Sequence, residues 1–439
     1  MLITGFKTHD VRFPTSLNKD GSDAMNKDSD YSAAVVILET DSELQGHGLT
    51  FTLGRGNEIC EVAIQAIAPK LVGLKVEDLT ADMGKTWKLL TYDSQLRWIG
   101  PEKGAIHLAT AAVVNAVWDL YAKIEKKPLW RLISDFTPEQ LVSIIDFRYI
   151  DDALTPAEAL EILKAQEPTK ATRIAEMEKN GFPAYTTSAG WLGYSDDKVR
   201  ALCKEAIEKF GFTVFKQKVG ANQDDDVKRA RLIREVVGYD NATLMMDANQ
   251  VWGVKQAIDW MQPLLEFKPK WIEEPTSPDD ILGHAAIRKA LYPATGIATG
   301  EHVQNRIIFK QLLQANAIDF VQIDSCRLGG VNEVISVMLL AKKFGKPVCP
   351  HAGGVGLCEH VQHLSILDYV VISGDLTDRV CEFVDHLHEH FVDPCVVKGG
   401  KYVAPSVPGY STELHADSIT NWSFPDGPSW VQLRAEGKI

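Results

Sequence analysis

The sequence of 439 residues predicts an α/β protein built around a closed parallel β-barrel. From about Pro183 onward, short β-rich runs alternate with helical stretches, which is typical of parallel sheets. Reactive side chains also recur at the ends of these runs, one per strand-helix unit of roughly 30 residues. Seven or eight such repeats favour a barrel over an open doubly wound sheet. The open sheet predicts a Gly-rich dinucleotide turn, which this sequence lacks.

A mixed α and β unit is expected over residues 1–140. Ala33 to Glu39 is a β-rich run, while Glu58 to Val72 and His107 to Glu125 carry apolar residues at helical spacing. Pro14 to Asp30 is rich in Ser, Asn, Asp and Gly, so we expect a loop there, and this loop is a candidate lid. The buried stripe expected on the second helix consists of Ala109, Val113, Ala116, Val117 and Leu120.

A connecting helical segment is expected over residues 141–182 and the barrel over residues 183–392. The expected strands are Phe212–Lys218, Thr243–Asp247, Trp271–Glu274, Ile297–Thr299, Phe320–Asp324, Pro347–Cys349 and Tyr369–Ile372. The expected helices between them include Asp226–Val237, Val254–Leu265, Asn305–Gln314 and Glu333–Phe344. The repeat then stops, and we expect the loop-rich tail, residues 393–439, to pack back on a neighbouring part of the chain.

The composition narrows the class of partner. A formal net charge of −13 argues against nucleic acid, because phosphate binding needs clustered basic residues. No apolar stretch of membrane-spanning length is evident, and the N-terminus lacks the pattern of a signal peptide. The seven cysteines are odd in number and scattered, which fits a reducing compartment. We therefore expect a cytoplasmic protein with neither a nucleic-acid nor a membrane partner.

Residues of the types used in catalysis and metal binding lie at the carboxyl ends of the expected strands. In a barrel these ends converge on one cavity, where barrel enzymes keep their active sites. In chain order the ends carry Lys216 and Lys218, Asp247 and Asn249, Glu273 and Glu274, Glu301, Asp324, His351 and Glu382.

Lys216 and Lys218 are two residues apart, so on a strand both side chains point the same way. Two neighbouring ammonium groups lower each other's pKa, which moves a lysine toward a usable general base. The alternative is a solvated strand edge.

Three carboxylates, Asp247, Glu273 and Glu301, follow three successive strands. They would repel one another unless a cation lay among them, and hard oxygen ligands suit Mg²⁺. Strand alternation favours Glu273 over Glu274 as the inward residue. Taken singly, each acid would more often be a helix cap or a surface charge, but the set at regular spacing favours a metal site.

Asp324 and His351 stand on the next two ends. An Asp that accepts from one imidazole nitrogen fixes the tautomer and raises the pKa, leaving the other nitrogen to transfer a proton. The alternative is a core histidine bonded to a backbone carbonyl.

A zinc site is a rival interpretation. The candidate ligands match no closed Cys/His finger spacing, and histidines at steps of two share no helix face. These candidates are Cys349, His351, Cys358, His360 and His363, with His386, His388 and His390 further along.

The strand-end residues resemble the enolase superfamily, mandelate racemase subgroup. The resemblance lies in Lys216-x-Lys218, Met246-Asp247-Ala248-Asn249, Trp271-Ile272-Glu273-Glu274-Pro275, Thr299-Gly300-Glu301, and Asp324 with His351. It implies an N-terminal α+β capping domain, a modified (β/α)₇β barrel, and a C-terminal segment that returns to the cap.

Within that superfamily the chain resembles the L-fuconate dehydratases along nearly its whole length. The similar stretches are Val11–Ser16, Gly21–Met25, Leu96–Gly104, Tyr185–Ser188, His351–Cys358 and Glu382–Leu387. One departure is Gln217, where an apolar residue more commonly separates the two lysines; it is expected to face away from the cavity.

The resemblance implies Mg²⁺ on Asp247, Glu273 and Glu301, stabilising an enediolate, as is typical of the enolase superfamily. It also implies that Lys218 removes the C2 proton and that His351, oriented by Asp324, protonates the departing C3 hydroxyl. The further implied substrate contacts are Lys216 and Asn249 in the barrel, Glu382 as a hydrogen bond to the enediolate if protonated, and Gly21, Ser22, Asp23 and Tyr31 of the cap.

The expected activity is Mg²⁺-dependent dehydration of an acid sugar, L-fuconate, to its 2-keto-3-deoxy product. The expected partner is this small molecule, and we expect a homo-oligomer. Another acid-sugar dehydratase or an epimerase remains open, because a base on each face of the substrate also suits racemisation. Two further alternatives are a Schiff-base barrel aldolase and a non-catalytic interaction protein on an enzyme scaffold.

Overall fold

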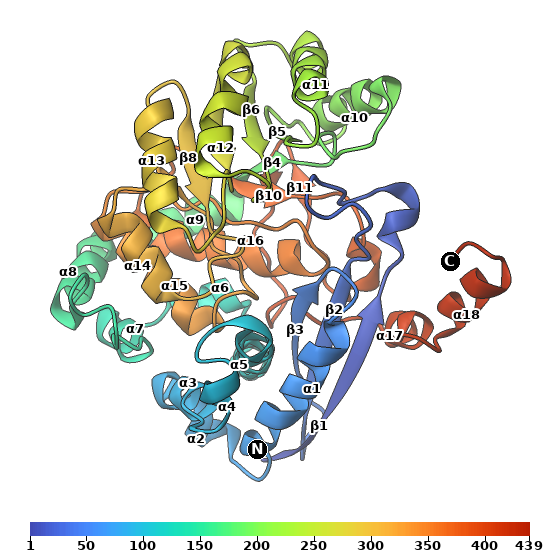
Figure 1. Ribbon diagram of the computed structural model, residues 1–439. Coiled ribbons are helices and arrows are strands. Elements are labelled where there is room, and N and C mark those ends of the chain that lie inside the picture. Colours follow the sequence, from blue (N-terminus) through green and yellow to red (C-terminus); the bar gives the residue numbers. More distant parts are fainter.

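The computed structural model describes residues 1–439 as a cap, a barrel and a C-terminal segment that joins the two (Figure 1). The cap contains an antiparallel sheet of order β1-β2-β3, with bounds Ile3–Arg12, Ser32–Thr40 and Gly46–Thr52. The expected run Ala33–Glu39 lies in β2, whose apolar side chains are buried.

The helices that follow this sheet are α1 (Asn57–Ile67, extended by a 3₁₀ turn, Ala68–Leu71), α2 (Val76–Thr80), α3 (Met83–Thr91), α4 (Leu96–Ile99), α5 (Gly104–Ile124), α6 (Leu129–Ser134) and α7 (Pro138–Ser143). Of these, α1 and α5 pack against the sheet. The backbone of α5 approaches β3 closely: a Cβ on Gly48 would lie 2.1 Å from the carbonyl oxygen of Ala112. Only glycine permits this approach.

Helix α5 corrects one expectation. By length and composition alone it could cross a membrane, whereas the sequence was expected to contain no apolar stretch of that length. However, 83% of its apolar window is buried inside the protein, and the predicted stripe from Ala109 to Leu120 is fully buried. Its apolarity is therefore that of a core helix, packed against β3 and α1.

Helices α8 (Pro156–Gln166) and α9 (Lys170–Asn180) connect the cap to the barrel. Thr155 and Glu158 form a capping box that starts α8. The barrel strands are β4 (Phe182–Thr186), β5 (Val214–Lys218), β6 (Thr243–Asp247), β7 (Pro269–Glu273), β8 (Gly296–Thr299), β9 (Phe320–Val321) and β10 (Cys381–Phe383). Each of β4 to β8 pairs in parallel with the next strand.

The barrel closes through short contacts. Val348 bridges Val321, the Glu382 amide donates to the Pro350 carbonyl at 3.1 Å, and β10 pairs in parallel with β4. The stretches Phe320–Asp324 and Pro347–Cys349 are thus strand positions with little regular pairing. The predicted (β/α)₇β class with a cap is confirmed.

Seven helices surround the barrel in alternation with its strands (Figure 1). They are α10 (Asp196–Glu208), α11 (Gln223–Val237), α12 (Val254–Met261), α13 (Ile281–Leu291), α14 (Arg306–Gln314), α15 (Val331–Lys343) and α16 (Leu357–Leu367). A 3₁₀ turn, Gln262–Phe267, follows α12. Asn222 and Asn305 cap α11 and α14 with their side-chain oxygens, as their residue type favours.

The expected strand Tyr369–Ile372 is wrong. These residues lie in a π-helical turn, Asp368–Ser373, that continues α16, and the last barrel strand is β10. The run is buried on all sides, so its apolar residues show neither helical nor strand periodicity. A short apolar run of this kind fits a buried strand and a buried helix equally well.

The C-terminal segment returns to the cap. Its hairpin of β11 (Val397–Lys398) and β12 (Lys401–Tyr402) pairs with β4, and α17 (Ala416–Trp422) and α18 (Pro428–Ala435) lie beside β1 (Figure 1). The Trp430 indole donates to the Arg12 carbonyl at 3.0 Å. The cap is therefore completed by both ends of the chain, and it covers the carboxyl end of the barrel.

Candidate active site

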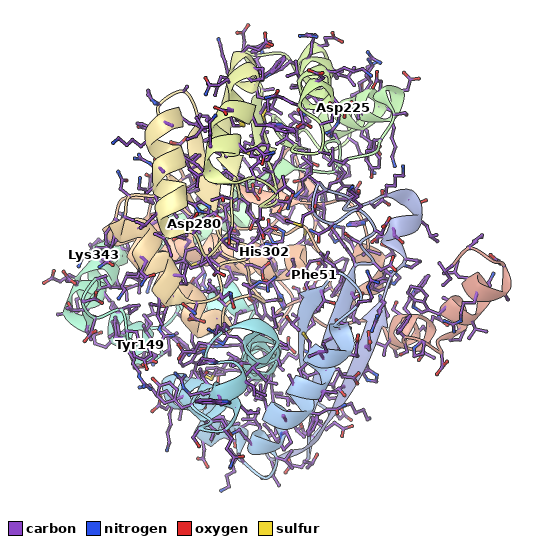
Figure 2. All side chains as sticks on the ribbon, viewed as in Figure 1. Phe51, Tyr149, Asp225, Asp280, His302 and Lys343 are labelled. Carbon is purple, nitrogen blue, oxygen red and sulfur yellow. The ribbon has the colours of Figure 1, made fainter.

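A cavity of about 230 Å³ lies between the cap and the carboxyl ends of the barrel strands. Lys218, Asn249, Glu301, Asp324, His351 and Glu382 line its barrel side. Figure 2 shows His302 at this end of the barrel, with Phe51 of β3 reaching toward the same region from the cap; both line the cavity. The topology thus brings together side chains as far apart in the sequence as Lys218 and Glu382.

The carboxylates of Asp247, Glu273 and Glu301 form one cluster behind this lining. One oxygen from each lies within 4.8 Å of the others. Asp247 and Glu273 are fully buried, and the Trp271 indole donates to Glu273 at 3.1 Å. Glu274 is directed instead toward His302, with Oε1 3.0 Å from the imidazole Nδ1.

This cluster has the features of a divalent-cation site. Oε2 of Glu301 is buried and has no hydrogen-bond partner. Burial and the neighbouring Asp247 raise the pKa of Glu273 well above its usual value, because together they outweigh the opposing effect of Lys216. Three clustered oxygen donors with space beside them suit a hard cation such as Mg²⁺.

Both lysines of the Lys-x-Lys motif point into the cluster. Nζ of Lys216 lies 2.8 Å from Glu273 and 2.9 Å from Glu382, while Nζ of Lys218 lies 2.6 Å from Asp247. Gln217 faces the other way, donating to the Asp226 carbonyl at 2.9 Å.

The pKa of Lys218 differs from the expectation. Burial lowers it and Lys216 lowers it further, but Asp247, Glu301 and Asp23 raise it, and the net pKa lies above the usual value. The effect predicted from the lysine spacing is present, but it is outweighed by the carboxylates. The amine becomes a base only when those negative charges are balanced.

Asp324 and His351 form a buried dyad. Nδ1 of His351 lies 2.8 Å from Oδ2 of Asp324, whose other oxygen accepts from the amides of Cys326 and Arg327. Burial lowers the pKa of His351, but Glu301, Asp324 and Glu382 raise it to about 9. The raised pKa favours a protonated imidazole at neutral pH. In this geometry Nε2 accepts from the Gly353 amide at 3.1 Å, a contact that a proton on Nε2 would displace.

The expected hydrogen bond from Glu382 to the enediolate depends on whether its carboxyl is protonated. Burial raises its pKa, but Lys216 and His351 lower it to about 2, so the carboxyl is ionised in this geometry rather than protonated. It accepts from the Ala352 amide at 2.9 Å and from the Thr187 hydroxyl. In this arrangement it holds Lys216 and cannot donate a hydrogen bond.

The cap contributes the loop from Pro14 to Asp30. Gly21, Asp23 and Tyr31 line the cavity, and the Leu192 amide donates to the Ser22 carbonyl at 3.0 Å, which docks the loop on the barrel. The Ser22 hydroxyl donates to the Lys27 carbonyl at 3.3 Å and does not line the cavity. Oδ1 of Asn249, also named from the sequence, is buried without a partner and is free to bind a ligand.

Several site residues were not found from the sequence. Thr187 follows β4, a strand that was not among those expected, and Trp191 lies on the loop after it. His302 directly follows Glu301, and its Nδ1 also lies 3.3 Å from that carboxylate. A histidine next to a predicted ligand was the only available signal for this contact.

The residues of the zinc interpretation are mostly dispersed. His351 lies in the active site, His363 bonds to Ser411, and His386 packs between Tyr31 and Trp191. Cys358 and His388 do come together, with Cys395 as a third member that the interpretation did not include.

Comparison with known proteins identifies the family. Residues 198–418 match the family described as "Enolase C-terminal domain-like", and residues 19–134 match "Mandelate racemase / muconate lactonizing enzyme, N-terminal domain". The L-galactonate dehydratase of Hypocrea jecorina is 58% identical over 98% of this chain and 96% of its own length. The chain belongs to the enolase superfamily.

Solved structures of the enolase superfamily agree with the fold. Human mitochondrial enolase superfamily member 1 has 57% identity and a TM-score of 0.97, with 98% of each chain covered. The L-talarate/galactarate dehydratase of Salmonella typhimurium, liganded with Mg and L-lyxarohydroxamate, has 24% identity and a TM-score of 0.73 over 95% of this chain and 92% of its own. The resemblance to the superfamily is confirmed, but these names do not include L-fuconate dehydratase.

Proposed function

We propose that this protein is a Mg²⁺-dependent dehydratase of a six-carbon acid sugar. One observation carries the proposal: a cluster of three carboxylates lies against a lysine amine at one end and a histidine imidazole at the other, at the wall of one cavity. Lys218 lies against Asp247, and Nε2 of His351 lies 3.5 Å from Glu301. Similarity to a fungal L-galactonate dehydratase supports the reaction class.

Asp247, Glu273 and Glu301 would hold the cation, as their fit to a hard cation indicates. Mg²⁺ bound there would balance the negative charge of the cluster around Lys218 and would stabilise the additional negative charge that a bound 2-hydroxy carboxylate gains when it loses its C2 proton.

The chain's own residues perform two proton transfers. Lys218, as the neutral amine, takes the C2 proton of the substrate. His351 gives the proton on Nε2 to the C3 hydroxyl, which leaves as water, and Asp324 stabilises the imidazole orientation throughout. The enol that remains tautomerises to the 2-keto-3-deoxy acid. Lys216, held by Glu382 and Glu273, positions the carboxylate end, and the Asn249 amide bonds to the substrate.

L-fuconate is the substrate we propose. It shares the configuration of L-galactonate and differs only in carrying a methyl group where L-galactonate carries a hydroxymethyl group. The cap side of the cavity supplies Phe51, Leu53 and Leu108, an apolar surface suited to a methyl group. Asp23 and Tyr31 remain available for hydroxyl groups of the sugar.

A panel of acid sugars tests both claims. Purified protein with Mg²⁺ is expected to convert L-fuconate to a 2-keto-3-deoxy product, with a higher kcat/KM than for L-galactonate and for stereoisomers at C2 to C5. EDTA is expected to abolish turnover and added Mg²⁺ to restore it. Higher kcat/KM for L-galactonate would overturn the substrate assignment alone. An epimer as product, or trapping by borohydride with indifference to EDTA, would overturn the dehydratase.

We also propose a homo-oligomer in the cytoplasm. Trp98 and Ile99 of α4 are 91% and 70% exposed, an unusual display of apolar surface for a monomer. All seven cysteines are free, which suits a reducing compartment. Light scattering at several protein concentrations tests the assembly, and cell fractionation distinguishes the cytoplasm from the mitochondrion named for the human relative.

A further inference from the structure

Four potential metal ligands meet outside the active site, where the C-terminal segment joins the barrel. Cys358 and Glu359 lie in the first turn of α16, His388 lies in a 3₁₀ turn after β10, and Cys395 precedes β11. One ligand atom each of Cys358, His388 and Cys395 lies within 4.8 Å of the others. We refer to these four residues as the thiol cluster.

The distances suit tetrahedral coordination. Sγ of Cys395 lies 3.5 Å from Nδ1 of His388. Tetrahedral Zn²⁺, with bonds of about 2.3 Å to sulfur and about 2.0 Å to nitrogen, places those two atoms roughly 3.5 Å apart. Oε1 of Glu359 lies 2.7 Å from the same nitrogen, as a hydrogen bond requires. Glu359 lies outside the group of three whose ligand atoms are within 4.8 Å of one another, so this carboxylate would have to move to become the fourth ligand.

His388 is oriented as metal-binding histidines usually are. Its Nε2 lies 2.8 Å from the Val384 carbonyl, so this nitrogen carries a proton and donates it. Without a metal, Nδ1 shares a second proton with Glu359. Nδ1 then faces the two thiols and Glu359. Metal ligands of this type almost always donate their second ring N–H to a carbonyl or carboxylate in this way.

Burial gives a second, independent indication. Cys358 and Glu359 are 0% and 1% exposed, and Oε2 of Glu359 is buried with no hydrogen-bond partner. Such an atom is costly unless something binds it. Atoms that could coordinate a cation are thus gathered where water cannot reach them to form hydrogen bonds.

We propose that the thiol cluster binds one structural Zn²⁺ ion through Cys358, Cys395, His388 and Glu359. Binding displaces the two thiol protons and the proton shared by His388 and Glu359. The ion ties the start of α16 to the segment that follows β10. It is separate from the carboxylate cluster, since the two share no residue.

Cobalt substitution of the full-length protein tests the site. Reduced, chelator-treated protein is titrated with Co²⁺ in excess Mg²⁺, which occupies the carboxylate cluster but does not bind thiolates. One equivalent of Co²⁺ is expected to give a thiolate-to-cobalt charge-transfer band and the strong d–d bands of tetrahedral coordination, and Zn²⁺ is expected to abolish both. Absence of the charge-transfer band in the reduced wild-type protein would overturn the proposal.

Two variants complete the test. Cys395→Ser is expected to weaken Co²⁺ binding more than about tenfold while sparing turnover, because Cys395 touches no active-site group. Cys203→Ser, at a buried free thiol on α10 outside the cluster, is the matched control and is expected to bind Co²⁺ normally. Equal binding by both variants would refute the ligand assignment. A Cys358–Cys395 disulfide that forms in air and survives excess Zn²⁺ would show a redox pair instead.

Discussion

Lys218 and His351 differ in the carboxylate that raises the pKa of each. Lys218 is held by Asp247 at 2.6 Å, whereas His351 is held by Asp324 at 2.8 Å and faces Glu301 across 3.5 Å. Lys218 thus lies at one end of the carboxylate cluster and His351 at the other. If Lys218 takes the C2 proton and His351 protonates the leaving hydroxyl, the two steps are separable by mutation.

Substitution at each position should therefore give a different residual activity. Lys218→Ala is expected to lower kcat by about 10³ or more and to abolish exchange of the C2 hydrogen with D₂O. His351→Asn is expected to stop dehydration to a similar extent but to retain C2 exchange, because Lys218 remains. Proton NMR of the substrate in D₂O measures exchange, and product assays measure turnover.

Lys204→Ala is the control, since Lys204 is exposed on α10 and does not line the cavity. Full dehydratase activity in either active-site variant would refute the assigned roles. Loss of exchange in His351→Asn would show that the two groups do not act in separate steps.

At the scale of elements, the loop from Pro14 to Asp30 forms the wall of the cavity opposite the barrel. Gly21 has a φ of +78°, and a Cβ there would lie 2.4 Å from the ring of Tyr31. Tyr31 in turn packs edge-on against Phe51, with ring centroids 5.0 Å apart. The loop therefore sets the position of an aromatic side chain that lines the cavity.

Gly21→Ala should displace Tyr31 and so weaken substrate binding. We expect KM to rise by about tenfold, with a stability loss of about 1–2 kcal/mol from backbone strain. Gly73→Ala is a matched control, because Gly73 has a φ of +85° but no atom within 4 Å of the added Cβ. Its stability should fall similarly with KM unchanged. Equal KM values in the two variants would exclude the contact with Tyr31 as the cause.

At the scale of the whole molecule, a buried ion network joins the cap to the barrel. Arg306 of α14 lies 3.1 Å from Glu333 of α15 and 2.9 Å from Asp146 of the connecting segment. Glu333 also lies 2.6 Å from His107 of α5. Because the cavity lies between the two domains, this network helps to maintain the distance between the cap and the strand ends.

Glu333 makes this interface sensitive to acid. Burial raises its pKa, but His107 and Arg306 lower it from the ordinary value of 4.5 to about 2. A carboxyl with a depressed pKa in the folded state stabilises the protein above pH 4.5 and loses this contribution as the pH falls toward 2. The contribution is about 3 kcal/mol at neutral pH, on the order of 1.4 kcal/mol per pKa unit.

Glu333→Gln is expected to lower the free energy of unfolding at pH 7 by about 3 kcal/mol and to flatten its decrease between pH 4.5 and 2. Urea unfolding at a series of pH values measures both effects. Glu43→Gln, at an exposed position, provides the control. A pH dependence of Glu333→Gln parallel to that of the wild type would contradict the assignment.

Much of the barrel was predictable from the sequence because its signals are local. Strand β6 was expected with its observed bounds, and β5, β7 and β8 within two residues at each end. Their carboxyl-terminal residues share one cavity because parallel strands converge there, so regular spacing along the chain becomes proximity in space. The positions of Lys218, Asp247 and His351 follow from this rule alone.

Other features depend on contacts between distant segments. Tyr369–Ile372 is helical, but the sequence does not identify it as such, because burial on all sides removes the hydrophobic periodicity of a helix. The ionised state of Glu382 depends on Lys216, which is 166 positions earlier in the chain and 2.9 Å away. The meeting of Cys358, His388 and Cys395 likewise depends on how the C-terminal segment folds back. Residue type and spacing identify which groups carry the chemistry, whereas charge states and ligand sets depend on distance and burial, which exist only in the folded chain.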